Sequence, residues 1–166
     1  MPLNNPLAQA VRTLADFTKQ KLIIPSLREQ EATAAILEMS RALQREGRIA
    51  DSHKFSQPVI KREFLGGTVT EPGWAIGHGL VKDSNEPCFA FGRWLSPKIW
   101  TNNQLKVSLV FLFAVPEIHV QAFNQLVISL GEFSKSNQLV EQLLKAGDVN
   151  EILQVLRHGS PRPDAG

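Results

Sequence analysis

The chain has 166 residues and a mass of 18.4 kDa, a size that fits one domain with its own hydrophobic core. Its 18 basic and 16 acidic side chains are spread along the sequence and leave a formal net charge of +2, which argues against a nucleic-acid partner. No segment approaches the ~20 apolar residues of a membrane-spanning helix, and the N-terminus lacks the pattern of a signal peptide. We therefore expect a cytoplasmic protein without direct membrane insertion.

The first half of the sequence predicts three helices and one short strand. Apolar residues at helical spacing predict an amphipathic helix over residues 7–17. The β-branched segment 21–25 ends in proline and predicts a strand at the edge of a sheet. Helices are then expected over residues 29–45 and 52–65, the second with a late start because Pro58 interrupts it.

The second half predicts a loop, two strands and a helical end. Residues 66–73 contain three glycines and a proline, as is typical of a surface loop. Two apolar runs, 88–95 and 107–115, are predicted strands, and the second is almost continuously hydrophobic, like a strand covered on both faces. The single cysteine, Cys88, lies in the first run and is predicted to be a buried thiol. Three further helices are expected over residues 118–133, 137–145 and 149–157.

Strands in the middle of the chain and helices on both sides of them predict an α/β domain with three layers, in which a central mixed β-sheet lies between two helical layers. We expect this domain to cover residues 20–158. Residues 1–19 are predicted to form an N-terminal helical extension, and residues 159–166 a flexible tail with nothing to bury.

One of the four histidines, His78, lies in an unusual setting. It follows the apolar run 74–76 and stands between two glycines, which would leave the imidazole or the backbone beside it open to a large reactant. The residues alone leave a second interpretation open, a histidine at a bend of the chain. His53 and His158 lie near polar helix ends and are expected to be solvated.

The segment that carries this histidine resembles the signature of a family. Residues 62–79 read Arg-Glu-Phe-Leu-Gly-Gly-Thr-Val-Thr-Glu-Pro-Gly-Trp-Ala-Ile-Gly-His-Gly, similar without a gap to the signature of type-2 enzyme IIA domains of the phosphotransferase system, the mannitol, fructose and nitrogen-regulatory group. The matching residues are Arg62, Glu63, Gly66, Thr68, Gly73, Ala75, Ile76, His78 and Gly79. The resemblance continues through residues 96–100 and 107–116 and covers about residues 20–157.

The resemblance implies an enzyme IIA mannitol-like fold and a phosphocarrier. In the family the signature histidine accepts a phosphoryl group from HPr or its paralogue, which implies His78 as the acceptor here. A neutral imidazole is a good nucleophile near pH 7, and its phosphoramidate stays reactive. Onward transfer to an enzyme IIB, or use of the phosphorylated state as a signal, is implied, with no metal or organic cofactor. A chain of this length without fused segments is typical of a free-standing, nitrogen-regulatory member.

The same resemblance assigns expected roles to further residues. Arg62 would balance the charge of the phosphate, although it could also be an ordinary helix-surface arginine. His119 would orient or stabilise the phosphorylated histidine, unless it merely begins a helix. Thr68, with Gly73 and Gly79, would form a phosphate loop, in which the hydroxyl donates to phosphate or simply shapes the loop.

Two departures from the signature favour an alternative function. Gly77 stands where the family has proline, and Glu71 brings a negative charge into the loop. The alternative is a non-catalytic regulatory module that binds a partner protein through the surface around residues 66–79. Both hypotheses predict an exposed, partly apolar surface around His78. The three tryptophans could contribute to it, although core positions are favoured for Trp74, Trp94 and Trp100.

Overall fold

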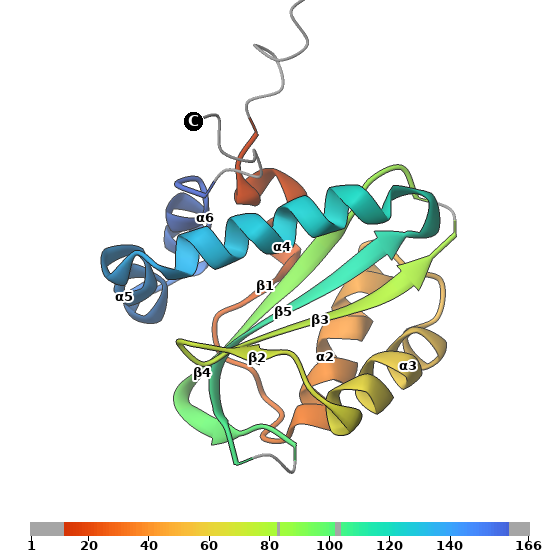
Figure 1. The fold of residues 1–166 in the computed structure, drawn as a ribbon, viewed down its shortest axis with the longest axis horizontal. Coiled ribbons are helices and arrows are strands. Elements are labelled where there is room, and N and C mark those ends of the chain that lie inside the picture. The colour runs from red at the N-terminus through yellow and green to blue at the C-terminus, as the bar shows by residue number, and fades with distance from the viewer. Residues whose placement is uncertain (1–11, 83, 102–103, 160–166) are drawn as a thin grey trace, which may run out of the picture.

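The computed structural model describes residues 12–82, 84–101 and 104–159 and has the predicted three-layer arrangement. A five-stranded mixed sheet lies in the middle, with helices on both of its faces (Figure 1). The predicted α/β/α class is therefore confirmed. No helix among these described residues is long and apolar enough to cross a membrane.

The sheet is ordered β1-β4-β5-β3-β2. The strands are β1 (Ile23–Ile24), β2 (Val69–Thr70), β3 (Trp74–Val81), β4 (Cys88–Ile99) and β5 (Lys106–Pro116). The central strand, β5, runs antiparallel to β4 and parallel to β3. It is buried along most of its length, as its continuous apolar run predicted.

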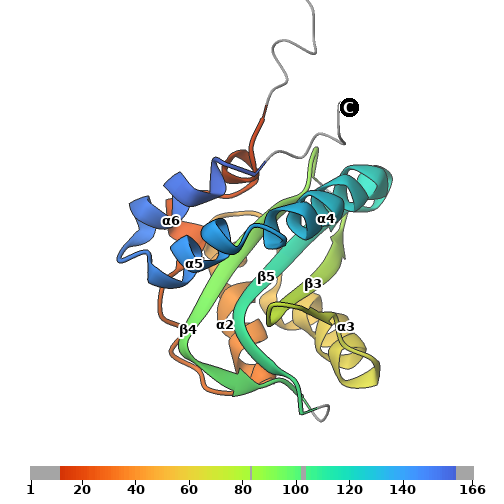
Figure 2. The ribbon, with the colours of Figure 1, turned by 60° about the vertical axis from the view of Figure 1, so that its left-hand side comes forward.

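Helices cover both faces of the sheet. On each face they pack against a different set of side chains from the same strands. On one face lie α2 (Ala32–Arg45) and α3 (Ser52–Leu65), which pack against alternate strand residues such as Val110 and Leu112. The other face, on which Phe111 and Phe113 lie, is covered by α4 (Val120–Ser134), α5 (Asn137–Lys145) and α6 (Val149–Leu156). Figure 2 shows α2 and α4 on opposite sides of the sheet.

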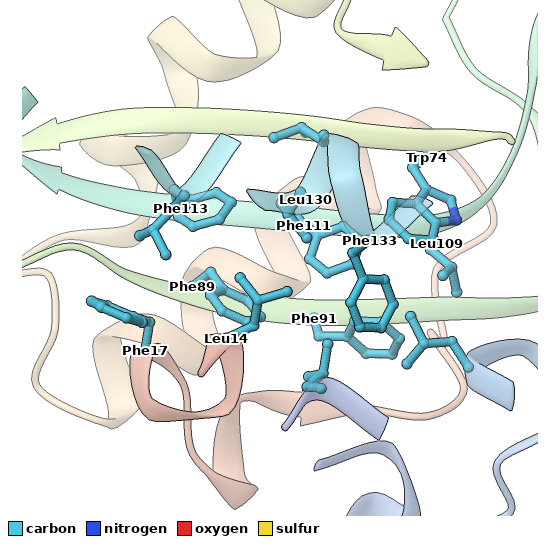
Figure 3. Packing of buried hydrophobic residues seen from close by; sticks show 14 of the residues in the cluster. Leu14, Phe17, Trp74, Phe89, Phe91, Leu109, Phe111, Phe113, Leu130 and Phe133 are labelled. Atoms are coloured by element: carbon cyan, nitrogen blue, oxygen red, sulfur yellow. The ribbon is translucent and has the colours of Figure 1, made fainter. Parts of the chain in front are cut away.

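The face under α4 has an aromatic core. Rings from β3, β4 and β5 meet there, with centroid distances of 5.2 Å for Trp74 and Phe111 and 5.1 Å for Phe89 and Phe113 (Figure 3). Offset and tilted aromatic pairs of this kind add to the stabilisation that burial gives. The core on the opposite face, under α2 and α3, buries Cys88 at the start of β4, and burial raises the pKa of this thiol to about 11, as expected for an unreactive cysteine.

The described part of the N-terminal segment differs from the amphipathic helix predicted over residues 7–17. Residues 1–11 lie outside the described part of the chain, and Leu14–Phe17 form one turn of 3₁₀-helix, η1. Leu14 is fully buried in the aromatic core, and its N–H donates to Gly159 O at 2.9 Å. Residues 14–17 thus pack on the main fold, while the predicted tail from residue 160 lies outside the described residues.

Helix α3 covers the predicted residues 52–65 without the late start expected from Pro58, which lies in its interior. The start at Ser52 has a local cause, since the Asp51 carboxylate accepts hydrogen bonds from the N–H groups of His53 and Lys54. The strands are also longer than expected: β4 continues past a register shift to Ile99, and the predicted loop contains the short strand β2.

Candidate functional site

His78 lies in β3 and points its half-buried ring toward α4. The ring centroid is 4.7 Å from that of Phe123 in α4, with the planes tilted by 38°. Burial lowers the pKa of His78 below its ordinary value, and the positive charge of Arg62 lowers it further. The imidazole is consequently neutral near pH 7, the form that can act as a nucleophile.

The strand that carries His78 has an outer edge with little strand pairing. Short β2 pairs with β3 only through Val69 with Ala75 and Thr70 with Trp74. Within the described residues, no strand borders the rest of that edge, from Ile76 to Val81. Its backbone N–H and C=O groups therefore need other partners.

Side chains from the end of α3 and the loop after it supply two of these partners. Arg62 Nη1 donates to His78 O at 2.6 Å, and the Ile76 N–H donates to Thr68 Oγ1 at 3.1 Å. The structure thus brings Arg62 and Thr68 to the strand of His78, with Arg62 at the backbone of the histidine itself, while their roles toward phosphate stay predictions.

Glu63, next to Arg62, is a site residue to which the sequence analysis gave no role. Its carboxylate is only 2% exposed and accepts hydrogen bonds from Thr68 Oγ1 at 2.9 Å and from Trp100 Nε1 at 2.9 Å. The signal that could have found it is its place in the signature. The burial of Glu63 could not be predicted from the sequence, because it depends on the packing of Trp100, which follows the far end of β4.

The glycines beside His78 serve helix packing. Successive strand residues point to opposite faces, so Gly77 and Gly79 face α3 while His78 faces α4. A Cβ at Gly79 would lie 2.5 Å from Cε2 of the Phe55 ring, and one at Gly77 would lie 3.3 Å from Val59 Cγ1. The missing side chains let α3 approach β3 closely, which brings Arg62 within reach of His78.

The structure does not bring Gly73 to His78. Gly73 has a φ of +98°, which suits glycine, and its N–H already donates to Thr70 O at 2.7 Å. It precedes His78 by five residues, about 16 Å along an extended strand. Glu71 lies in the same turn, so its negative charge is far from the imidazole.

His119 lies in η3 (Glu117–His119), the exposed turn just before α4. Phe123, which contacts the His78 ring, follows about one helical turn later. The described hydrogen bonds include none between His119 and His78, so the orienting role of His119 stays a prediction.

Exposed apolar side chains lie next to His78 in the chain and at the start of α4. Leu80 is 54% exposed two residues after His78, and Ile118 and Val120, on either side of His119, are 78% and 43% exposed. None of the tryptophans belongs to this surface, because Trp74, Trp94 and Trp100 are buried. The core position favoured for each of them is confirmed.

The sequence matches the family model described as phosphoenolpyruvate-dependent sugar phosphotransferase system, EIIA 2, over residues 16–159. The chain belongs to this family. Its sequence is also 25% identical to a 2-O-α-mannosyl-D-glycerate-specific EIIABC component from Escherichia coli strain K12, in an alignment that covers 97% of this chain and 25% of that protein. The chain thus spans about a quarter of that EIIABC relative.

Solved structures of the family have the same fold. The nitrogen regulatory protein IIA-Ntr from Neisseria meningitidis superposes with a TM-score of 0.71 at 24% identity, covering 86% of this chain and 98% of that one. The Escherichia coli IIA mannitol structure gives a TM-score of 0.65 at 21% identity, covering 83% and 97%. These likenesses establish an enzyme IIA mannitol-like fold.

Proposed function

We propose that this EIIA domain is a phosphocarrier that accepts a phosphoryl group on His78 and passes it on. The observation that carries the proposal is the setting of His78 within the family match: a neutral, half-buried imidazole on a strand whose backbone is held by Arg62. The proposed donor is an HPr-type phosphohistidine protein. We also propose a reducing cytoplasm as the location, in line with the free, buried thiol of Cys88.

In the proposed transfer, the unprotonated ring nitrogen of His78 attacks the phosphorus of the donor. The N–P bond to the donor imidazole breaks as the new N–P bond forms, so one phosphohistidine replaces another and no further reactant is consumed. Phe123 and the surrounding core limit the positions of the ring, which reduces the entropy lost on reaching the reactive geometry.

Arg62 is the proposed partner for the phosphate charge. Its Nη1 donates to His78 O, and no other hydrogen bond of the guanidinium is found in the described part of the chain. The remaining N–H donors can therefore bind phosphate oxygens while the first bond is kept. Phosphoryl transfer depends mainly on positioning and on stabilising charge at the equatorial oxygens, which a guanidinium supplies.

The proposed acceptor is an enzyme IIB, or a regulatory target that responds to the phosphorylated state. Two likenesses support these alternatives. One solved structure, a complex of enzyme IIA mannitol with phosphorylated enzyme IIB mannitol from Escherichia coli, matches this chain with a TM-score of 0.67 at 20% identity, and the IIA-Ntr protein is a nitrogen regulator. The exposed side chains of Leu80, Ile118 and Val120 would lie in the contact with donor and acceptor.

Intact-mass spectrometry tests the proposal. The protein is incubated with phosphoenolpyruvate, enzyme I and an HPr-type protein, and a single phosphate adduct that is lost in acid is expected. The adduct should be absent from His78→Ala and present in His53→Ala, a matched control because His53 is an exposed histidine at the start of α3.

The absence of an adduct with cognate donors would contradict the proposal. It would favour the non-catalytic alternative, a regulatory module that binds its partner through the same surface, for which the glycine at position 77 is the remaining departure near the histidine. Partner binding that is unchanged in His78→Ala would support that alternative. An adduct that persists in His78→Ala would place the acceptor on another residue.

A further inference from the structure

We propose that Glu63 is a positioning residue for His78, and that its buried carboxylate acts through Thr68 to hold the part of β3 that carries the histidine. The inference rests on the proposed function, because the position of His78 matters for phosphoryl transfer. Among the described residues, the hydrogen-bond donors to the Glu63 carboxylate are Thr68 and Trp100 and not the imidazole of His78, so its effect must pass through a neighbour.

The burial of Glu63 is unusual for a carboxylate. The side chain is 2% exposed, and none of the ion pairs among the described residues includes it. Its donors are two neutral groups, the Thr68 hydroxyl and the Trp100 indole N–H. Burying a carboxylate without a counter-charge is unfavourable for folding, so stability alone does not explain its presence here.

The carboxylate determines the direction of the Thr68 hydrogen bonds. A hydroxyl has one proton, and Thr68 Oγ1 lies within hydrogen-bond distance of both Glu63 oxygens, at 2.9 and 3.1 Å. Because a carboxylate only accepts, the proton points to Glu63 and the lone pairs of Oγ1 are left for the Ile76 N–H at 3.1 Å. A charged acceptor also strengthens the bonds in such a chain.

Two consecutive residues of α3 therefore fix two neighbouring backbone groups on the outer edge of β3. Glu63, through Thr68, holds the N–H of Ile76, and Arg62 holds the carbonyl of His78. The opposite edge of the same segment pairs with β5. The backbone of the histidine is thereby fixed on both sides, which sets where its ring meets the incoming phosphoryl group.

The experiment measures kcat/KM for phosphoryl transfer to His78 in Glu63→Gln, Thr68→Val and the double variant. Each single change should lower kcat/KM by about tenfold, because small displacements of a reacting group are costly for the rate. The glutamine amide would donate to Thr68 Oγ1 and compete with Ile76, whereas valine removes the hydroxyl. The double variant should be no slower than Thr68→Val, because both changes break one chain of contacts.

Two further variants separate positioning from stability. Thr68→Ser keeps the hydroxyl and should restore wild-type kcat/KM. Trp100→Phe removes the other donor to Glu63 and should lower the melting temperature, yet leave kcat/KM close to wild type. Losses in the double variant that multiply, or a loss in Trp100→Phe equal to that in Glu63→Gln, would overturn the proposal.

Amide hydrogen exchange gives a readout that needs no phosphoryl donor. The N–H group of Ile76 should exchange faster in Glu63→Gln and Thr68→Val than in the wild type and in Trp100→Phe. Unchanged exchange at Ile76 would overturn the positioning role. A wild type that takes no phosphate but shows the expected exchange would overturn the proposed function and leave the structural link from Glu63 to His78 intact.

Discussion

The pKa of His78 is lowered by its surroundings on two sides. An aromatic ring lies on one side of the imidazole, and a cation lies beyond the strand on the other. Phe123 contacts the imidazole face, and removal from water disfavours the charged form. Arg62 acts in the same direction, because a second positive charge nearby is unfavourable. The residue is thus kept in its nucleophilic form by contacts that are far apart in sequence.

A pH titration checks this tuning. The folded-state pKa of His78 is lowered from the ordinary value of 6.5, so the phosphorylation rate should stay high as pH falls through 6.5 and drop only at lower pH. The same lowering of the pKa contributes to the free energy of unfolding. This contribution is fully present above the pKa of His78 in the unfolded chain, and it is lost as pH falls through the pKa in the folded protein. NMR titration of the ring protons and initial rates measure both effects.

Arg62→Gln serves as the comparison in that titration. Removing the cation should raise the pKa of His78 toward 6.5, while the half-buried position keeps it from returning fully. A His78 pKa at or above 6.5 in the wild-type protein would contradict the described setting of the imidazole.

A buried arginine links strand β4 to two segments outside the sheet. Arg93 is 4% exposed and lies at the register shift between Arg93 and Lys98. Its Nε donates to Pro25 O at 2.9 Å and its Nη1 to Leu143 O at 2.8 Å, near the end of α5. A single side chain therefore satisfies carbonyls from two separate segments, one before α2 and one in α5.

Arg93→Lys should destabilise the fold although it keeps the positive charge. One ammonium cannot reproduce the fork of the guanidinium, and a buried carbonyl left without a donor costs about 1–3 kcal/mol. Urea unfolding followed by circular dichroism measures the loss of free energy of unfolding. Arg157→Lys, an exposed change in the turn after α6, should leave that free energy nearly unchanged. Equal stability of Arg93→Lys and wild type would contradict the bonding role of Arg93.

The whole molecule is stabilised by two cores, one on each face of the sheet, and the ends of the described chain contribute to one of them. Leu14 in η1 packs beside Phe133 of α4 against Gly159, where an added Cβ would lie 2.4 Å from Leu14 Cδ1 and 2.9 Å from Phe133 Cδ2. Residues 14–17 thus add to the core next to the domain predicted for residues 20–158.

Leu14→Ala tests this contribution in the full chain. Truncation of a fully buried leucine should lower the free energy of unfolding by about 2–5 kcal/mol, from lost burial and the cavity left behind. Leu144→Ala is the matched control, because that leucine is 40% exposed and should cost less than about 1 kcal/mol. A small effect of Leu14→Ala would mean that η1 is peripheral to the core.

The signature in the sequence was enough to propose His78 as the site histidine and to single out Arg62 and Thr68, which the structure places beside its strand. It could not show that Gly73 lies far from the histidine, because that depends on where β2 turns back beside β3. Nor could it find Phe123, whose contact with the imidazole is created when α4 packs across the sheet. Contacts between residues far apart in the sequence leave no local pattern.

The sequence by itself predicted most of the helices and the long strands β4 and β5, together with the burial of β5 and of the tryptophans, and it singled out His78 as the candidate for chemistry. These features depend on periodicity, local propensity and a local motif, and each of these signals lies within a short continuous segment of the sequence. Only the tertiary structure decided that β3 has little strand pairing along its outer edge among the described residues, that α3 and the loop after it supply partners there, and that Glu63 is buried beside them. The reason is that strand order and helix docking are set by the packing of the whole chain around two cores.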